Sequence, residues 1–282
     1  MICAWKEFLS ILPLRIRDDV DKQGKKNLQE LRFRIGKPVQ MIMGKDTLTL
    51  PIDSTEADLN FVVNTASQYS PWAAATAAKG FITAPGGHRI GLCGDAVIRS
   101  GDLTGIRSLT SICIRVARDF PGIASKIAGL NGNILILGPP GCGKTTLLRD
   151  LIRQISTQKR RCICVVDERW ELFPQSRQSM CFETGDYTDI LTGCTKSQGL
   201  SMAVRTMGPS CIAVDEITSA EDCEALTQAG WCGVRLLATA HGASAADLKN
   251  RPIYKQLVEN GLFDWLVVMD KDMTCYPERM VK

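Results

Sequence analysis

The chain is poor in aromatic residues, in histidine and in long apolar runs. Of its 282 residues, 6% are aromatic and two are histidine. No apolar run approaches the roughly 20 residues that a transmembrane helix needs. The first residues, MICAWKEFLSILPLRIRDD, are charged and too interrupted for a secretory signal. We therefore expect a cytoplasmic protein with no transmembrane segment of its own.

The net charge and the cysteines limit the partners and the compartment that can be expected. A formal charge of +4 is small for this length and favours no partner by itself. Basic and aromatic residues are not interleaved, so no specific nucleic acid is expected as a partner. The twelve cysteines include no C-x-x-C pair and no Cys/His spacing of a metal site. We expect them to be reduced and to pack as small apolar residues, as is typical of the cytosol.

The first 120 residues mix short helix and strand patterns. Trp5, Phe8 and Leu12 recur at helical spacing, and Thr55 with Asp58 forms a possible capping box for a second helix. A third helix is expected from Ser70 to Gly80. Strand patterns occur in LQELRFRIGKPVQMIMG, FITAPGGHRIGLCGDAVI and SICIRVAR. This half predicts a small α+β domain over residues 1–120, in which the turn residue His88 is structural.

The most specific motif is a phosphate-binding loop in NILILGPPGCGKTTLLRDLI. An apolar strand leads into Gly-x-x-x-x-Gly-Lys-Thr and then into a helix. In such a loop the backbone N–H groups surround phosphate oxygens, Lys144 neutralises the outer phosphates, and Thr145 holds Mg²⁺. The expected ligands are therefore ATP and Mg²⁺. The residues expected to bind the nucleotide are Gly138, Pro139, Pro140, Gly141, Cys142, Gly143, Lys144, Thr145 and Thr146.

Apolar, β-rich runs alternate downstream with stretches long enough for helices. These runs are CICVVDE, CIAVDE, VRLLATAH and DWLVVMD. Such alternation predicts a mainly parallel sheet with crossover helices. The fold class is therefore α/β, a RecA/AAA-like P-loop NTPase domain over residues 121–282. The smaller α+β domain precedes it, and a linker helix is expected at about 121–132.

Two strands end in the same Asp-Glu pair, and only one pair is needed beside the phosphate. CIAVDE offers a hydrophobic strand before Asp215, which is the pattern of the acid that helps hold Mg²⁺. Glu216 points elsewhere because strand side chains alternate, and we expect it to act as general base. In VVDER, Asp167 and Glu168 either assist catalysis from the flank or bind Arg169 or a helix cap. We count Glu168 among the catalytic candidates.

His241 ends the strand LLATAH, where parallel-sheet ligands bind. It lies two residues after Thr239, so both point to the same face of the strand. A hydrogen-bonding group at this place is suited to sensing the γ-phosphate. We therefore add His241 to the catalytic candidates.

The order of these motifs resembles that of the secretion-superfamily ATPases of type II and type IV secretion, the VirB11-like proteins. GPPGCGKT, VVDER, MAVRTMGPSCIAVDEI and LLATAHG are similar to their Walker A, acidic, Walker B and histidine boxes. Three segments of the first half, LRFRIGKPVQ, GFITAPGGHRIGLCGDAV and GIRSLTSICIRVAR, resemble the N-terminal domain of a sporulation branch. The resemblance thus covers most of the chain.

That resemblance implies a cytoplasmic ATPase, peripheral to a membrane complex, that forms a homo-hexameric ring. It implies partners among the membrane proteins of a channel or secretion apparatus between mother cell and forespore. In such ATPases nucleotide lies between the two domains, and N-domain arginines help to neutralise its phosphates. Arg115 and then Arg107 match these arginines, and Arg205 matches a further family arginine.

Other functions stay open at this point. A nucleic-acid motor or loader of the RecA or AAA type has the same core motifs but needs a basic channel or stacking aromatics. A scaffold that binds ATP for assembly and hardly hydrolyses it would carry the same residues. A small-molecule kinase would need a lid for its acceptor, and no such segment follows the phosphate loop.

Overall fold

The computed structural model describes residues 1–67, 77–78, 80–176 and 179–280. Most of the helix expected from Ser70 to Gly80 lies outside these residues. The chain divides into two compact units. The first comprises Met1–Asp119 and Pro174–Cys181, and the second comprises Phe120–Phe173 and Phe182–Lys282. No composition change or motif in the sequence predicts that the short segment Pro174–Cys181 groups with the first unit.

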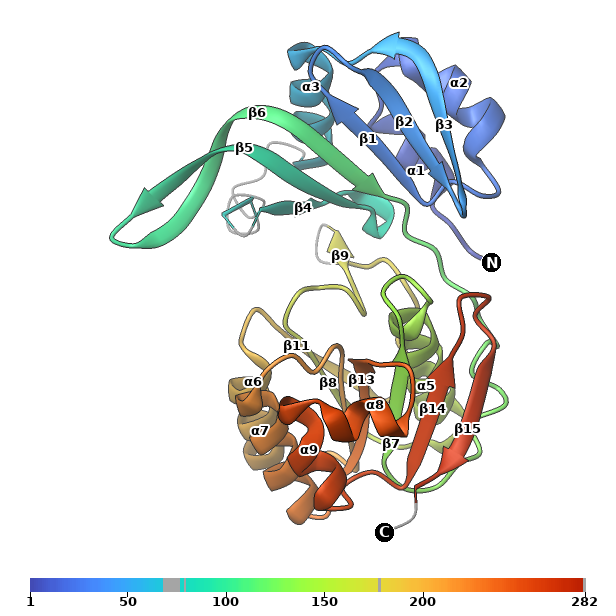
Figure 1. Ribbon diagram of the computed structural model, residues 1–282, viewed down its shortest axis with the longest axis vertical. Coiled ribbons are helices and arrows are strands. Elements are labelled where there is room, and N and C mark those ends of the chain that lie inside the picture. The colour runs from blue at the N-terminus through green and yellow to red at the C-terminus, as the bar shows by residue number, and fades with distance from the viewer. Residues whose placement is uncertain (68–76, 79, 177–178, 281–282) are drawn as a thin grey trace. The chain divides into compact units, whose positions relative to one another are not determined.

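The first unit is an antiparallel sheet with helices packed against it (Figure 1). Its helices are α1 (Trp5–Ser10), α2 (Leu14–Gly24) and α3 (Glu56–Ser67), with a short 3-10 turn η1 (Pro85–Gly87). Its strands are β1 (Glu30–Arg34), β2 (Pro38–Met43), β3 (Asp46–Asp53), β4 (Phe81–Thr83), β5 (Arg89–Arg99) and β6 (Asp102–Arg115), in the order β3-β2-β1-β6-β5-β4. The short strands β9 (Gln175–Ser176) and β10 (Ser179–Met180) pair with each other.

Local sequence explains several of these elements. The predicted capping box at the start of α3 is present, because Asp58 accepts from the Thr55 backbone N–H and its own N–H donates to the Thr55 hydroxyl. His88 is fully buried: the Ala117 N–H donates to its Nδ1 at 3.1 Å, and its Nε2 lies 3.0 Å from the Ala4 carbonyl. Burial lowers the pKa of His88 to about 4. His88 is therefore a neutral residue that joins three segments.

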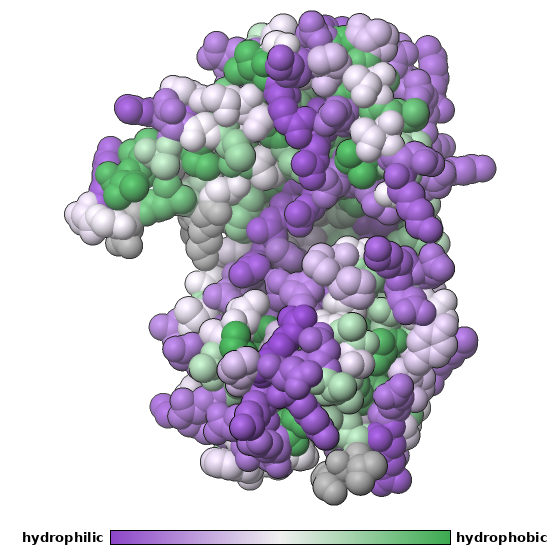
Figure 2. Space-filling model, in the orientation of Figure 1, coloured by the Kyte–Doolittle hydropathy of each residue, from purple (hydrophilic) through white to green (hydrophobic). Residues whose placement is uncertain are grey.

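The β5–β6 hairpin continues beyond the strands that flank it, and it bends at a β-bulge between Cys93 and Asp95. At the bulge a Cβ on Gly94 would lie 2.6 Å from the Arg107 carbonyl oxygen, so only glycine fits there. Hydrophobic residues gather on the outer part of this hairpin (Figure 2), where Ile98 and Leu103 are exposed. The hairpin therefore leaves apolar surface in solvent.

The second unit is a seven-stranded sheet with helices on both faces (Figure 1). Its strands are β7 (Ile134–Gly138), β8 (Ile163–Asp167), β11 (Thr188–Thr192), β12 (Cys211–Val214), β13 (Arg235–His241), β14 (Trp265–Met269) and β15 (Cys275–Arg279), in the order β11-β8-β12-β13-β7-β14-β15. Only β15 runs antiparallel to its neighbour. Its helices are α5 (Lys144–Lys159), α6 (Lys196–Thr206), α7 (Ala220–Trp231), α8 (Ala245–Asn250) and α9 (Pro252–Glu259).

The central strands β7, β8, β12 and β13 are apolar on both sides because helices cover both faces. Residues of α6, α7 and α9 pack with one set of alternate strand residues in a single buried cluster, and α5 lies on the other face of the sheet (Figure 1). Every parallel strand ends at one edge, here called the carboxyl edge. The phosphate-loop motif and both acidic pairs fall at this edge, as the strand pattern predicts.

The expected linker helix at 121–132 is wrong. Residues 121–129 form successive hydrogen-bonded turns, such as the bond from the Ser125 N–H to the Gly122 carbonyl. Gly122 has φ +92°, which a right-handed helix does not allow, and the buried carboxylate of Asp150 accepts from the Ala124 N–H at 2.8 Å. A tertiary contact thus takes a backbone donor that a helix would use.

All twelve cysteines are free thiols. Among the described residues, no helix is both long enough and apolar enough to span a membrane.

Candidate active site

The phosphate-loop motif forms a tight turn between β7 and α5. Gly143 precedes the first helical residue with φ +96°, a backbone conformation that glycine adopts without strain. Gly138 closes β7, and a Cβ there would lie 2.5 Å from the Cys142 sulfur. Pro139, Pro140 and Gly141 make the outer part of the turn. Thr145 and Thr146 lie in the first helical turn, whose free N–H groups are suited to binding an anion.

Lys144 is largely buried, and its ammonium group lies within the loop. Its Nζ donates to the carbonyls of Gly138 at 3.0 Å and Pro139 at 2.9 Å. It also lies 3.1 Å from Nδ1 of His241. Burial lowers the pKa of Lys144. Within the described part of the chain, Nζ contacts two carbonyl oxygens and a ring nitrogen and no carboxylate, so it is positioned to exchange these acceptors for an anionic ligand.

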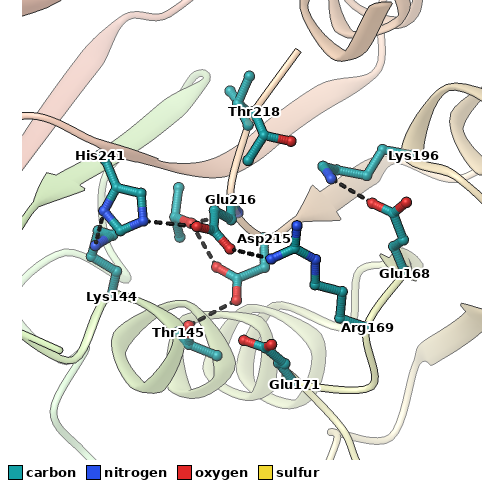
Figure 3. A network of polar contacts seen from close by, with 12 residues as sticks. Lys144, Thr145, Glu168, Arg169, Glu171, Lys196, Asp215, Glu216, Thr218 and His241 are labelled. Atoms are coloured by element: carbon teal, nitrogen blue, oxygen red, sulfur yellow. Dashed lines mark hydrogen bonds and ion pairs between the residues drawn. The ribbon is translucent and has the colours of Figure 1, made fainter. Parts of the chain in front are cut away.

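Asp215 follows β12 and is bound from two sides (Figure 3). The Thr145 hydroxyl donates to its Oδ2 at 2.7 Å, and the Thr239 hydroxyl donates to its Oδ1 at 2.6 Å. The Thr145 hydroxyl and a carboxylate are hard oxygen ligands of the kind that Mg²⁺ prefers. Their contact shows that both can reach one small cation. The residues present thus fit the magnesium ion that the motif implies.

Glu216 is the second acid of this pair, and its backbone has φ +53°, which is unusual outside glycine. Its N–H donates to the Thr239 hydroxyl at 2.7 Å, so one buried threonine holds both acids. Its carboxylate lies 2.8 Å from Nε2 of His241 and 3.0 Å from Nη1 of Arg169. Burial raises the pKa of Glu216, but the hydrogen bond from His241 and the charge of Arg169 outweigh it, so the pKa is lowered.

His241 connects the phosphate loop with Glu216 (Figure 3). Lys144 can only donate, so Nδ1 of His241 accepts. Nε2 then carries the proton and donates to Glu216. This tautomer is neutral. Two hydrogen bonds in series therefore connect Lys144 through His241 to Glu216, so a movement of Lys144 changes the first of them.

The first acidic pair is engaged differently. Asp167 is buried and accepts from the N–H groups of Glu171 and Phe173, both at 2.9 Å. Burial raises its pKa to about 6. Glu168 forms an ion pair with Lys196 at 2.6 Å. Asp167 therefore shapes the turn after β8. Glu168 lies at the carboxyl edge as expected, but a buried lysine holds its carboxylate.

The three candidate arginines are not gathered in one place by the described contacts. Arg115 is at the end of β6, 65% exposed, with its Nε 3.5 Å from Glu30. Arg107 is exposed on the β5–β6 hairpin and lies opposite Asp95 in register. Arg205 is exposed in the last turn of α6 and precedes the start of β12 at Cys211, so it lies away from the carboxyl edge of its own sheet. Their catalytic roles stay predictions.

Two residues escaped the list of candidates. The sequence predicts Arg169 only as a partner for the first acidic pair, yet it binds Glu216 of the second. Lys196, at the start of α6, is 5% exposed and lies 3.4 Å from Asp222 as well as beside Glu168. No local pattern marks either residue, because the Arg169 contact depends on β8 lying beside β12 and the Lys196–Glu168 contact depends on β11 lying beside β8.

Comparisons with known proteins show the family of the chain. The family model described as "Sporulation stage III, protein AA" matches residues 5–279. The chain is 37% identical over 271 residues to the stage III sporulation protein AA of Bacillus subtilis (strain 168), covering 92% of this chain and 88% of that protein. It is 26% identical over 268 residues to the protein SEEDLING PLASTID DEVELOPMENT 1 of Arabidopsis thaliana, covering 89% of this chain and 35% of the plant protein.

Two solved structures share the fold. The ATPase DotB of Legionella pneumophila has a TM-score of 0.61 at 15% identity, covering 95% of this chain and 80% of DotB. The pilus retraction motor PilT, solved with bound ADP, has a TM-score of 0.61 at 16% identity, covering 90% of this chain and 77% of PilT. The predicted fold, a P-loop domain preceded by a smaller α+β domain, is confirmed. The family match over nearly the whole length, together with the 37% identity, shows that this chain belongs to the stage III sporulation protein AA family.

Proposed function

We propose that the protein is a Mg²⁺-dependent ATPase that works as a ring-forming motor, a homo-hexamer, and energises a channel or secretion complex between mother cell and forespore. One observation carries the enzymatic part. Thr145 of the phosphate loop, Asp215 of β12 and Thr239 of β13 form one hydrogen-bonded row, with Glu216 fixed beside it. Three separate strand ends thus bring together the groups that a nucleoside triphosphatase needs.

Each residue has a role that its contacts allow. Lys144 exchanges its carbonyl acceptors for phosphate oxygens of ATP, and the N–H groups at the start of α5 bind the same phosphates. Thr145 and Asp215 would hold Mg²⁺, which supplies charge neutralisation at the phosphates. Glu216 takes the proton of the attacking water as general base.

His241 reports the state of the phosphates. Its Nδ1 faces the lysine that binds them, and its Nε2 faces the base. When Lys144 moves to a phosphate, His241 loses the donor at Nδ1 and keeps its bond from Nε2 to Glu216. The restraint that His241 places on Glu216 then depends on whether nucleotide is bound.

The motor role is supported by the family and by the fold. The B. subtilis relative is named as a sporulation protein, and PilT, which shares the fold, is named as a motor. In a ring, Arg115, Arg107 and Arg205 would contact phosphate or a neighbouring copy, which agrees with their exposure. Glu168 would assist from the flank. The protein would then work in the cytoplasm, at the surface of a membrane complex whose proteins are its partners.

Three proteins test the enzymatic proposal. The wild type is compared with Lys144→Ala and Glu216→Gln for binding of a fluorescent ATP analogue and for phosphate release with and without Mg²⁺. We expect Lys144→Ala to lose binding, and Glu216→Gln to keep binding while its kcat falls at least a hundredfold. Equal slow turnover in the wild type and Glu216→Gln would contradict an ATPase and favour a nucleotide-dependent assembly scaffold. Mass measurement with a non-hydrolysable analogue tests the ring.

A further inference from the structure

The carboxylate of Glu216 is held between two donors that come from different places (Figure 3). His241 belongs to the central strand β13, and its ring lies 2.8 Å from Oε1. Arg169 comes from the turn after β8, and its Nη1 lies 3.0 Å from Oε2. A water that is to give its proton to Glu216 must hydrogen-bond to one of these oxygens. Each oxygen keeps a second lone pair for the water, but a donor already bound to that oxygen narrows the approach, and a cationic donor makes the carboxylate a weaker base.

Of the two donors, Arg169 is the exchangeable one. Its side chain is 51% exposed and belongs to a turn, whereas that of His241 is 33% exposed and belongs to β13, which pairs with β12 and β7. Arg169 lines a recess together with Glu168 and Glu171, so two further acidic residues lie in the same recess as Glu216.

The turn that carries Arg169 is itself firmly built. The buried carboxylate of Asp167 accepts two backbone N–H groups from the far side of the turn, at Glu171 and Phe173. Trp170, between them, has φ +53°, a conformation that a side chain of this size adopts only when its surroundings hold it. The turn therefore directs Arg169 toward Glu216. The two hydrogen bonds to Asp167 fix the conformation of this turn.

We propose that Arg169 is a latch for Glu216: its guanidinium binds one oxygen of the carboxylate that acts as base, and ATP hydrolysis is faster once Arg169 has moved away. The proposal rests on the assignment of Glu216 as the base of an ATPase. Arg169 is in this sense a positioning residue, since it acts through Glu216. It also gives the first acidic pair a use, because Asp167 holds the turn that presents the latch.

The test is steady-state ATP hydrolysis by the full chain and by the variants Arg169→Ala and Arg169→Lys. We expect Arg169→Ala to raise kcat about fivefold, which corresponds to the loss of one partly exposed ion pair, with KM within twofold of the wild type. Lysine keeps a positive charge near the carboxylate, so Arg169→Lys should stay within twofold of the wild-type kcat. Arg161, two residues before β8 and exposed at the other edge of the sheet, provides the matched control Arg161→Ala.

Two further measurements separate the latch from other causes. Binding of a non-hydrolysable ATP analogue with Mg²⁺ should be unchanged in Arg169→Ala, because the latch restrains the base and leaves nucleotide binding unaffected. Adding Glu216→Gln to Arg169→Ala should abolish the gain in kcat. The latch is refuted, and the ATPase proposal stands, if wild-type kcat falls on Glu216→Gln but Arg169→Ala has a kcat equal to or lower than that of the wild type. If no variant shows turnover that depends on Glu216, the ATPase proposal fails, and the latch fails with it.

Discussion

Replacing Thr239 by valine tests the centre of the site with almost no change in shape. The Thr239 side chain is fully buried, its hydroxyl donates to Asp215 at 2.6 Å and it accepts the Glu216 N–H at 2.7 Å. Valine fills the same volume but can do neither. The substitution therefore removes the partner of a carboxylate oxygen and of an N–H group in two partly buried hydrogen bonds.

The size of the effect follows from these two groups. A buried polar group that loses its partner costs about 1–3 kcal/mol, so the pair should cost about 3 kcal/mol of unfolding free energy. In a unit of this size that lowers Tm by about 9 °C. Glu216, whose left-handed backbone is unfavourable by about 1–2 kcal/mol, loses a bond that holds it there. We therefore expect kcat for ATP to fall by about tenfold or more as well.

Urea unfolding and ATP hydrolysis of the full chain measure both effects. Thr239→Ser keeps the hydroxyl and should recover most of the stability and activity. Thr227→Val is the matched control, because this buried threonine donates only to the Cys223 carbonyl within its own helix. The reasoning is refuted if Thr239→Val is as stable and as active as Thr227→Val.

Three other changes test separate parts of the structure. Lys196→Met leaves Glu168 and Asp222 without their buried cation and should lower the free energy of unfolding, measured in urea, by about 3 kcal/mol. Lys249→Met, at an exposed position, should leave it almost unchanged, and equal losses in the two variants would contradict the buried ion pair. Because the pKa of His88 falls to about 4 on folding from 6.5, the unfolded chain binds the proton first. Unfolding free energy should thus fall by up to about 3 kcal/mol between pH 6.5 and pH 4, and a His88→Gln chain with the same pH slope would disprove it. Gly143→Ala places a methyl group 2.8 Å from the Met273 side chain at φ +96°, and should weaken binding of an ATP analogue at least tenfold; unchanged affinity would show that the turn tolerates a Cβ.

The parts of the site that could be predicted from the sequence are those with local causes. The phosphate loop needs glycine at Gly138 and Gly143 for reasons internal to the turn. Asp215 and His241 follow from their place at the ends of apolar strands, because a parallel sheet gathers all such ends at one edge. The chain pattern alone therefore brought three strand ends together correctly.

The other parts depend on which strands are neighbours, and periodicity does not encode that. β8 lies between β11 and β12 and is separated from β7 by two strands. This order allows Arg169 to reach Glu216 and Lys196 to reach Glu168. The predicted linker helix at 121–132 is wrong for a similar reason. The helical pattern contains no information on the carboxylate of Asp150, which accepts from the Ala124 N–H.

The two acidic pairs show how the same local sequence acquires two roles. Both follow buried parallel strands, but only β12 is adjacent to β13, and only there can the Thr239 hydroxyl bind the first acid and the following N–H together. The acid after β8 has no such hydroxyl beside it, and its carboxylate instead closes its own turn onto two backbone donors. These backbone N–H groups can only donate, so they cannot share a metal ion with Asp167, whereas the Thr145 hydroxyl beside Asp215 can offer its oxygen to the same cation. Position in the sheet, and not the Asp-Glu motif, thus favours Asp215 and Glu216 for the chemistry.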